Sequence, residues 1–454
     1  MHKLLIANRG EIAVRVIRTA RALGMATVAV CSEADRDSLA ALAADEAVVI
    51  GPAPVTASYL NQQAILAAAH ATGADAIHPG YGFLSENADF AELVIGSGLN
   101  WVGPSPDAMR LMGDKVAALR AAKSAGVPVL AGSDGPLPAE ADDHAVLRIA
   151  HDIGFPLVIK AAAGGGGRGI RLVRAEKEFL AALDTARAEA KSGFGDDTVY
   201  LERFVERARH IEVQILGDGV DVVHLGDRDC TMQRRSQKVV EEAPAPLLPD
   251  AVRDRIRESS VALAKACGYA GVGTVEFLYD PAREEAAFIE MNTRLQVEHP
   301  VTEMITGLDL VAEQLRIADG APLGRTQADV TFTGHAFECR INAEDPARGF
   351  FPSPGVITRL AWPDGPGVRI DAGFAEGSTV TPFYDSMIAK LIVHADTRGA
   401  AIAGMAAALD RLAVEGIATT VGLHRTLFAH PAFGRVEHHT TFIENAPGIL
   451  EVSP

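Results

Sequence analysis

The sequence contains little cysteine and lacks any long apolar run. Its four cysteines, Cys31, Cys230, Cys267 and Cys339, are far apart, and none belongs to a C-x-x-C pair. This spacing argues against a disulfide framework and a structural zinc site, so we expect a reduced, cytoplasmic protein. No apolar segment approaches the length of a membrane span, and the apolar run near the N-terminus is short and followed at once by charged residues. We therefore expect neither a membrane span nor a secretory signal.

Basic residues are scarce relative to acidic ones. The chain carries 42 Lys and Arg against 59 Asp and Glu, which gives a formal net charge of −17. A surface that binds nucleic acid needs an excess of basic residues to neutralise phosphates, so this balance argues against nucleic acid as a partner. A local basic site for a smaller anionic substrate stays compatible with the composition.

The apolar content, in contrast, is ample. Apolar residues make up 48% of the chain, which is enough to build cores, and the length of 454 residues suggests about three domains of ordinary size. Up to about residue 112, strand-like runs alternate with helical segments. The expected strands are Lys3–Ala7, Ala26–Val30, Ala47–Ile50, Ala76–His78 and Asn100–Val102, and the expected helices include Tyr59–Ala71 and Ala88–Ser97. This alternation predicts an α/β fold with a parallel, doubly wound sheet.

The character of the chain changes again beyond about Thr331, where strand-like runs predominate. The expected strands there are His335–Asn342, Gly355–Leu360, Val368–Asp371 and Ser386–His394, and a helix is expected over Ala400–Leu412. We interpret this segment as a third, strand-rich unit.

A glycine run, Gly164-Gly-Gly-Gly-Arg-Gly169, satisfies the pattern G-x-G-x-x-G. A dinucleotide fingerprint must open a helix, whereas here the segment Ile170–Val173 continues as a strand. The Walker A motif is excluded, because Gly-Lys-Ser or Gly-Lys-Thr occurs nowhere. The run therefore predicts a loop between two strands whose backbone N–H groups approach phosphates, with Lys160 adding a positive charge. The alternative is an ordinary surface turn.

The stretch Glu290-Met-Asn-Thr-Arg-Leu-Gln-Val-Glu298 combines carboxylates, an amide and a guanidinium. It follows a strand-like apolar run. Because strand side chains alternate between faces, Glu290, Asn292 and Arg294 are expected on one face. The alternative is a solvated sheet face that carries ordinary charges.

A second strand-like run, Thr274–Tyr279, precedes this stretch across a turn at Asp280-Pro281. If the two runs pair as a hairpin, Glu276 comes towards Glu290. Neighbouring carboxylates repel unless one is protonated or a cation lies between them. With an asparagine oxygen beside them, we expect Mg²⁺, which takes oxygen ligands and shares them with substrate phosphates.

Arg234, Arg235 and Lys238 stand out in this acidic chain and directly precede Glu241-Glu242. A charge run is usually a solvated face. Here we expect it to supply the cationic wall that ATP and an anionic co-substrate require. The strand-like run Val199–Val205 is suited to line a purine pocket.

An ordered set of motifs closely resembles the biotin carboxylases, the ATP-grasp components of biotin-dependent carboxylases. The motifs are Ile6-Ala-Asn-Arg-Gly-Glu11, His78-Pro-Gly-Tyr-Gly-Phe-Leu-Ser-Glu-Asn87, Met112-Gly-Asp-Lys115, the glycine run, Met232–Pro246, Glu290–Ile305 and Phe337–Asp345. The likeness extends from about residue 3 to about residue 445. It implies an ATP-grasp fold with a Rossmann-like domain over 1–112, an ATP-grasp domain over 113–330 and a strand-rich C-terminal domain over 331–454. The ATP-grasp domain would carry a lid at about 131–203.

The resemblance also implies the residues of the site. The residues that would hold ATP are Lys115, Lys160, Gly166, Gly167, Glu202, Arg203, Phe204, Val205, His210, Gln233 and Ser236. Two Mg²⁺ or Mn²⁺ ions would be bound by Glu276, Glu290 and Asn292. Bicarbonate would be bound by Lys238, Arg294 and the backbone of Val297. Glu298 would be the general base for bicarbonate, and Arg340 would face the ureido oxygen of biotin. Ser236 stands where the family usually has His, which puts one nucleotide contact in doubt and predicts an altered ATP affinity.

The implied activity is ATP- and bicarbonate-dependent carboxylation of biotin through carboxyphosphate. This is the first half-reaction of a biotin-dependent carboxylase, which we expect to be an acetyl-CoA carboxylase. No Ala-Met-Lys-Met attachment motif occurs, so biotin is expected on a carrier protein or on a part of the polypeptide absent from this sequence. The implied partners are a biotin carboxyl carrier protein, a carboxyltransferase and a second copy of the chain in a homodimer. Two alternatives are another ATP-grasp ligase that joins a carboxylate to an amine, and a nucleotide-binding subunit without turnover.

Overall fold

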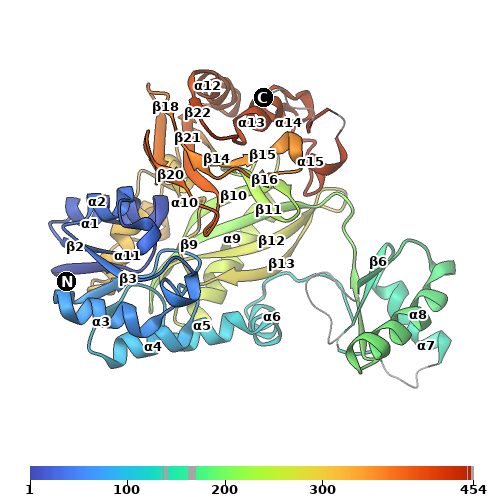
Figure 1. The fold of residues 1–454 in the computed structure, drawn as a ribbon. Coiled ribbons are helices and arrows are strands. Elements are labelled where there is room, and N and C mark those ends of the chain that lie inside the picture. Colours follow the sequence, from blue (N-terminus) through green and yellow to red (C-terminus); the bar gives the residue numbers. More distant parts are fainter. Residues whose placement is uncertain (134, 138–141, 162–169, 447, 451–454) are drawn as a thin grey trace. The chain divides into compact units, whose positions relative to one another are not determined.

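The computed structural model describes residues 1–454 except 134, 138–141, 162–169, 447 and 451–454 (Figure 1). The chain forms two compact units. The large unit consists of Met1–Val127, Arg209–Tyr279 and Phe288–Pro454, and the small unit consists of Pro128–Ala208 and Asp280–Ala287.

The N-terminal part of the large unit is a parallel five-stranded sheet in the order β3-β2-β1-β4-β5. Its strands are β1 (Lys3–Ile6), β2 (Ala26–Ser32), β3 (Glu46–Gly51), β4 (Ala76–His78) and β5 (Asn100–Trp101), and its helices are α1 (Gly10–Ala22), α2 (Leu39–Ala43), α3 (Gln62–Thr72), α4 (Ala88–Gly96), α5 (Pro106–Gly113) and α6 (Lys115–Ser124). Leu4 and Ile6 are buried in one core and Leu5 in another, because helices cover both faces of the sheet. The parallel α/β arrangement predicted from the sequence is confirmed.

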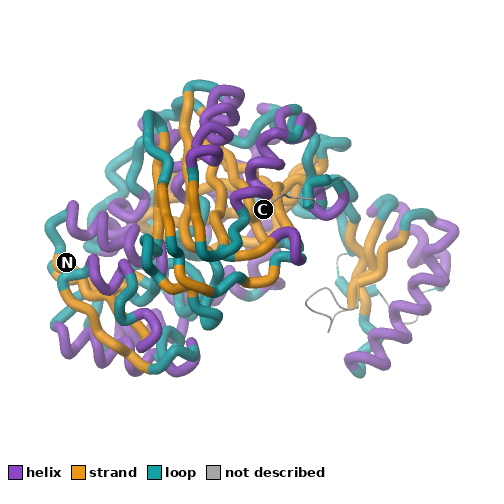
Figure 2. The backbone as a smooth tube through the Cα atoms, turned by 45° about the horizontal axis from the view of Figure 1, so that its top comes forward, coloured by secondary structure: helices purple, strands orange, loops and turns teal. Residues whose placement is uncertain are grey.

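The centre of the large unit is an eight-stranded sheet in the order β13-β12-β9-β10-β11-β14-β21-β19 (Figure 2). Its strands are β9 (Arg209–Asp218), β10 (Val222–Arg234), β11 (Gln237–Ala243), β12 (Ala270–Asp280), β13 (Glu285–Asn292), β14 (His335–Asn342), β19 (Val368–Ala372) and β21 (Met387–Ala395). The strand-rich C-terminal segment therefore extends the same sheet through β14, β21 and β19.

Two groups of helices cover opposite faces of this sheet near β14. Helices α12 (Arg398–Arg411) and α13 (Val421–Ala429) pack on the face that carries Phe337 and Cys339. Helix α10 (His299–Thr306) packs on Ala336 of the other face. The large unit also contains α9 (Asp250–Ala266), α11 (Leu310–Ala318), α14 (Pro431–Gly434) and α15 (Phe442–Asn445). The second face of β14 continues beyond α10 into polar residues, which form the site described below.

The prediction of a single strand over Gly355–Leu360 is wrong. The structure has two short strands there, β17 (Gly355–Val356) and β18 (Arg359–Ala361), which pair with β20 (Thr379–Val380) and β22 (Ala413–Glu415). Since each strand has a different partner far along the chain, local alternation does not reveal the break.

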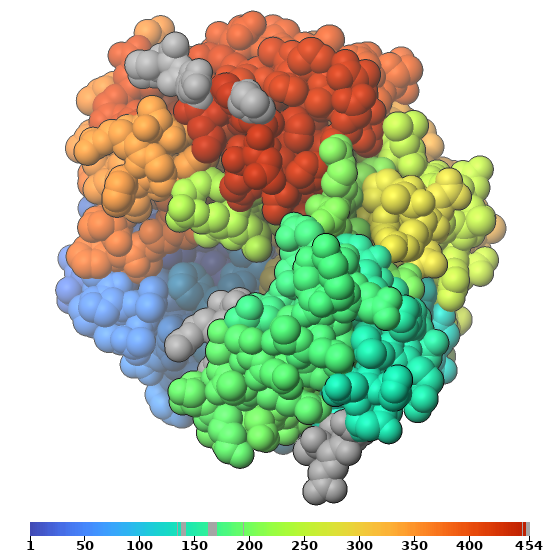
Figure 3. Space-filling view, turned by 90° about the vertical axis from the view of Figure 1, so that its right-hand side faces the viewer, coloured from blue at the N-terminus to red at the C-terminus, as the bar shows by residue number. Residues whose placement is uncertain are grey.

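The small unit is built on an antiparallel sheet in the order β7-β6-β8. Its elements are β6 (Leu157–Ala161), β7 (Ile170–Val173), β8 (Val199–Arg203), α7 (Asp143–Ile153) and α8 (Glu176–Phe194). Leu157, Ile159 and Phe179 are buried in its own core, and its side chains form the continuous teal and green surface in Figure 3. Strands β6 and β7 flank the glycine run as predicted, while the run itself lies outside the described residues.

None of the helices in the described part of the chain has both the length and the apolarity required to cross a membrane.

Candidate active site

The large unit contains a cavity of about 950 Å³. Most of the residues that the sequence predicted for a site in this unit line it: His210, Gln233, Ser236, Lys238, Glu276, Glu290, Asn292, Arg294, Val297, Glu298 and Arg340. They come from β9, β10, β11, β12, β13 and β14, from the turn between β10 and β11, and from the segment that precedes α10. The cavity is therefore where distant parts of the sequence bring these polar groups together.

The predicted hairpin is present. Strands β12 and β13 are neighbours in the sheet and are joined by the turn at 281–284. Glu276, Glu290 and Asn292 all line the cavity. Although β13 ends at Asn292, Nη2 of Arg294 donates to Oδ1 of Asn292 at 2.8 Å, and its Nε donates to Glu86 at 3.0 Å. The guanidinium expected on this face is thus fixed beside the amide.

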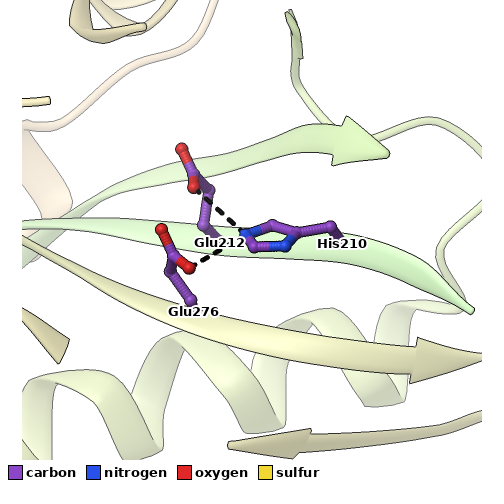
Figure 4. Close-up of side chains that lie close together, drawn as sticks. All are labelled: His210, Glu212 and Glu276. Carbon is purple, nitrogen blue, oxygen red and sulfur yellow. Dashed lines mark ion pairs between the residues drawn. The ribbon is translucent and has the colours of Figure 1, made fainter. Parts of the chain in front are cut away.

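His210, Glu212 and Glu276 point toward one another from β9 and β12 (Figure 4). Nε2 of His210 lies 3.1 Å from Glu276 and 3.6 Å from Glu212. Burial alone would lower the pKa of His210, but the two carboxylates outweigh it and raise the pKa to about 9. The imidazole is therefore protonated at neutral pH and compensates the charge of the carboxylates.

Lys238 is surrounded by three carboxylates. Its Nζ donates to Glu212 at 2.7 Å, to Glu276 at 2.9 Å and to Glu298 at 2.5 Å. Burial opposes the charge of this ammonium group, yet the carboxylates raise its pKa well above the ordinary lysine value. The side chain is thus a fixed positive charge in the wall of the cavity.

Arg228 donates hydrogen bonds to this cluster from a buried position. Its side chain is completely buried, and it donates to Glu212 at 2.6 Å and to Gln296 at 2.7 Å. Burial disfavours ionisation of Glu212, but Arg228 and Lys238 hold its pKa well below the ordinary value. Glu212 therefore stays ionised between two cations.

Glu298 is held by two cations. Its Oε1 accepts from Lys238, and its Oε2 accepts from Nη2 of Arg340 at 3.0 Å. Burial raises the pKa of Glu298, but Lys238 and Arg340 outweigh this effect and lower it. Nε of Arg340 also donates to Oε1 of Glu241 at 2.6 Å. The guanidinium thus connects Glu298 with Glu241 of β11.

Lys390 fixes the wall of the cavity next to Glu298. It is fully buried on β21, donates to the carbonyl oxygen of Val297 at 2.9 Å, and lies 3.2 Å from Oε2 of Glu11. Burial raises the pKa of Glu11 to about 7 despite this lysine. The backbone at Val297 is therefore anchored through a contact that no local sequence pattern indicates.

Some of the residues predicted for the site do not line the cavity. Lys115 is the first residue of α6, is exposed, and is not among the residues that line the cavity. The cationic wall expected from Arg234 and Arg235 is wrong, because Arg234 donates to the carbonyl of Gly349 at 3.0 Å and Arg235 is exposed in the turn between β10 and β11. Of that basic segment, only Lys238 lines the cavity.

A further set of predicted ATP contacts belongs to the small unit: Lys160, Glu202, Arg203, Phe204 and Val205. Lys160 forms an ion pair with Glu202, and Nε of Arg203 donates to the carbonyl of Ile153 at 2.8 Å. Gly166 and Gly167 lie outside the described residues.

The oxygen donors of the hairpin fit a hard divalent cation. Glu276, Glu290 and Asn292 offer carboxylate and amide oxygens to one cavity, which is the donor set that Mg²⁺ or Mn²⁺ takes. The ligand atoms of His210, Glu212 and Glu276 also lie within 4.8 Å of one another. However, a histidine must be neutral to bind a metal, and the raised pKa of His210 disfavours that role.

Sequence reasoning missed Glu212, Arg228, Glu241 and Lys390. For Glu212 a signal existed, because it lies two residues after the predicted site residue His210, and residues two apart in a strand share a face. The positions of Arg228 and Lys390 depend on pairing between strands that are distant in sequence.

Comparison with known proteins decides the family. The profile of the biotin carboxylase N-terminal domain matches residues 1–109, that of the carbamoyl-phosphate synthase L chain ATP-binding domain matches 114–326, and that of the biotin carboxylase C-terminal domain matches 338–445. The biotin carboxylase of Haemophilus influenzae is 53% identical over 455 residues, which cover 99% of this chain and 100% of the relative. The chain belongs to the biotin carboxylase family.

Solved biotin carboxylases share its fold. The biotin carboxylase domain of a thermophilic 2-oxoglutarate carboxylase, bound to ADP, has a TM-score of 0.94 and 45% identity over 100% of this chain and 99% of that one. The biotin carboxylase domain dimer of the Hydrogenobacter thermophilus 2-oxoglutarate carboxylase, in complex with MgADP, ADP and bicarbonate, has a TM-score of 0.86 and 46% identity over 100% and 99% of the two chains. The ATP-grasp fold and the biotin carboxylase resemblance predicted from the sequence are confirmed.

Proposed function

We propose that the cavity of the large unit carboxylates biotin with ATP and bicarbonate, by way of carboxyphosphate. The observation that carries this proposal is the position of Glu298, whose carboxylate accepts from Lys238 at 2.5 Å and from Arg340 at 3.0 Å inside the cavity. The two cations keep this buried carboxylate ionised and so able to accept a proton, and they attract the anion that would give it up.

Bicarbonate is a poor nucleophile until it loses its proton. Lys238 and Arg294 bind it, and Glu298 accepts the proton as a bicarbonate oxygen attacks the γ-phosphorus of ATP. The γ-phosphoryl group moves to bicarbonate, and ADP leaves. Carboxyphosphate then breaks down to CO₂ and phosphate, the phosphate removes the proton from the ureido nitrogen of biotin, and that nitrogen attacks CO₂ to form carboxybiotin. Arg340 stabilises the negative charge that develops on the ureido oxygen.

Glu276, Glu290 and Asn292 are the residues that would hold Mg²⁺ or Mn²⁺. When bound, the ions offset the charge of the nucleotide phosphates. The chain's own cations orient bicarbonate, and its buried carboxylates keep those cations in place.

We propose that the residues implied by the family resemblance contact ATP. They are His210, Gln233, Ser236, Lys115, Lys160, Glu202, Arg203, Phe204 and Val205, with the glycine run at Gly166 and Gly167. We also propose domain divisions at about residues 112 and 330 and a lid at about 131–203. The lid would exclude water, which destroys carboxyphosphate.

The substrate is biotin on a biotin carboxyl carrier protein, and the product passes to a carboxyltransferase. We propose a homodimer, because the relative from Hydrogenobacter thermophilus forms a dimer of this domain. A cytoplasmic location agrees with the four cysteines, all described and all without a disulfide. The choice of acyl acceptor, which we expect to be acetyl-CoA, depends on the carboxyltransferase.

Incubation with ATP, Mg²⁺, labelled bicarbonate and biotinylated carrier tests the proposal. We expect acid-labile label on biotin, and phosphate release that depends on bicarbonate. Phosphate release that depends on an added amine instead would establish the rival ligase activity. Absence of ATP turnover in the presence of all substrates would support the non-catalytic alternative.

The base is tested with Glu298→Gln, which keeps the size of the side chain and removes the proton acceptor. We expect a loss of about 10²–10⁴-fold in bicarbonate-dependent phosphate release. Glu415→Gln is the matched control, because Glu415 is 57% exposed and pairs only with Arg359 at the surface. Full activity in Glu298→Gln would overturn the assignment of the base.

A further inference from the structure

Glu241 and Glu338 form a buried pair of carboxyl groups next to Arg340. They are direct partners in the antiparallel ladder of β11 and β14, and both are 0% exposed. Side chains directly opposite in such a ladder have Cβ atoms about 4.5–5.5 Å apart and project from the same face. Because strand side chains alternate, Arg340, two residues beyond Glu338, lies on that face as well.

Most oxygens of this pair lack a donor. Oε1 of Glu241 accepts from Nε of Arg340 at 2.6 Å. Oε2 of Glu241 and both oxygens of Glu338 have no hydrogen-bond partner among the described residues. Two ionised carboxylates cannot occupy adjacent buried positions with three oxygens unsatisfied, because both the repulsion and the lost hydration are costly. We therefore expect one of the two carboxyl groups to be protonated.

The surroundings decide which carboxyl group holds the proton. Glu241 has a direct cationic partner in Arg340, whereas the side-chain oxygens of Glu338 have no hydrogen bond or ion pair within the described residues. Burial raises the pKa of Glu338 well above its usual range, and Lys390 opposes this only in part, while burial raises the pKa of Glu241 to about 7. Both observations favour a neutral Glu338 beside an ionised Glu241.

We propose that Glu338 is a positioning residue: as a neutral acid it donates a hydrogen bond to Oε2 of Glu241, and Glu241 holds Arg340 toward biotin. This inference rests on the proposed function, because it assumes that Arg340 contacts the ureido oxygen of biotin. Arg340 then has two anionic anchors, Glu241 and Glu298, at 2.6 Å and 3.0 Å. The contact of Arg340 with Glu241 stays in place when Glu298 takes up the proton of bicarbonate.

The test compares Glu338→Gln and Glu338→Leu with the unsubstituted chain. Glutamine is neutral and keeps an N–H donor for Glu241, so we expect its biotin carboxylation to stay within about threefold. Leucine leaves Oε2 of Glu241 without a donor, and loss of a hydrogen bond to a charged group predicts a fall of about tenfold or more in kcat/KM for free biotin. Bicarbonate-dependent phosphate release without biotin should fall much less. Ile392→Val is the matched packing control, because Ile392 is buried and lies directly opposite Glu338 on β21.

The proposal would be overturned if Glu338→Gln and Glu338→Leu lost the same amount of biotin carboxylation, or if Glu338→Leu lost none. It would also be overturned if biotin carboxylation and bicarbonate-dependent phosphate release fell equally in a variant with the melting temperature of the control. Should the leucine variant not fold, the infrared difference spectrum between the unsubstituted chain and Glu338→Gln at pH 7 decides. We expect the band of a protonated carboxylic acid to disappear in the variant, and an unchanged band would refute a neutral Glu338. Absence of biotin carboxylation in the unsubstituted chain would instead show that the proposed function has failed.

Discussion

Nζ of Lys238 lies 2.5 Å from Oε1 of Glu298, the residue proposed as the general base. The contact favours the ionised form of Glu298, and the same ammonium group contacts Glu212 and Glu276. One lysine thus stabilises three buried carboxylates that repel one another. The charge balance of the site therefore depends on that single side chain.

Replacing Lys238 with glutamine should reduce activity and change its pH dependence. We expect bicarbonate-dependent phosphate release to fall by about 10²–10³-fold, because a preorganised cation next to the reacting groups is lost. Lys238 lowers the pKa of Glu298, so its removal raises that pKa and moves the acid limb of the pH–rate profile to higher pH. Lys265→Gln, at a lysine that is 48% exposed and does not line the active-site cavity, is the control. An acid limb that stays in place would contradict this prediction.

Glu276→Gln should weaken divalent-metal binding. We expect the Mg²⁺ concentration for half-maximal activity to rise about tenfold or more, because glutamine replaces a charged oxygen ligand with a neutral one. Calorimetric titration of the variant with MgADP provides a readout that does not depend on turnover. Glu258→Gln, at an exposed position on α9, should behave like the unsubstituted chain. Equal Mg²⁺ dependence in both variants would remove Glu276 from the ligand set.

Arg228→Met should destabilise the protein by about 3–5 kcal/mol, because it leaves the buried carboxylate of Glu212 without its main partner. Arg359→Met, at an arginine that is 61% exposed, should change stability by no more than about 0.5 kcal/mol. Adding Glu212→Gln to Arg228→Met should restore part of the loss, since the unpaired charge is then gone. Urea unfolding of the three variants measures these differences, and a double variant less stable than Arg228→Met would argue against the charge explanation.

Glu11→Gln should alter the pH dependence of stability. The pKa of Glu11 is raised to about 7 by burial, so the folded chain retains a proton that the unfolded chain releases above about pH 4.5. The contribution of Glu11 to stability therefore declines as pH rises from about 4.5 to about 7 and is constant above that range. Glutamine does not titrate, so the melting temperature of the variant, measured relative to the unsubstituted chain, should increase over this interval. A difference that is independent of pH would show that Glu11 does not titrate there.

Much of the fold follows from local sequence. The strand Ala76–His78 and the strand His335–Asn342 have the bounds expected from their patterns. The hairpin that places Glu276 and Glu290 at one cavity also follows, because its strands are adjacent in sequence and separated by a recognisable turn.

The rest depends on pairing between distant strands. Lys390 reaches Val297 because β21 lies beside β14, and Arg228 reaches Thr274 and Gln296 across the sheet. No periodicity within a single segment encodes such contacts. The expectation for Arg234 and Arg235 failed for a related reason: Arg234 binds the carbonyl of Gly349, which is distant in sequence, and neither arginine lines the cavity.

The ladder that places Glu276 opposite Glu212, Lys238 opposite Gln233 and Arg340 opposite Lys390 has an evolutionary consequence. Deleting one residue inside any of these strands would move its polar side chains to the opposite face and its apolar ones toward the cavity. Insertions and deletions in related chains should therefore be confined to turns such as 281–284, while substitutions alone diversify the strands. Selection for a stable core thus also preserves the geometry of catalysis.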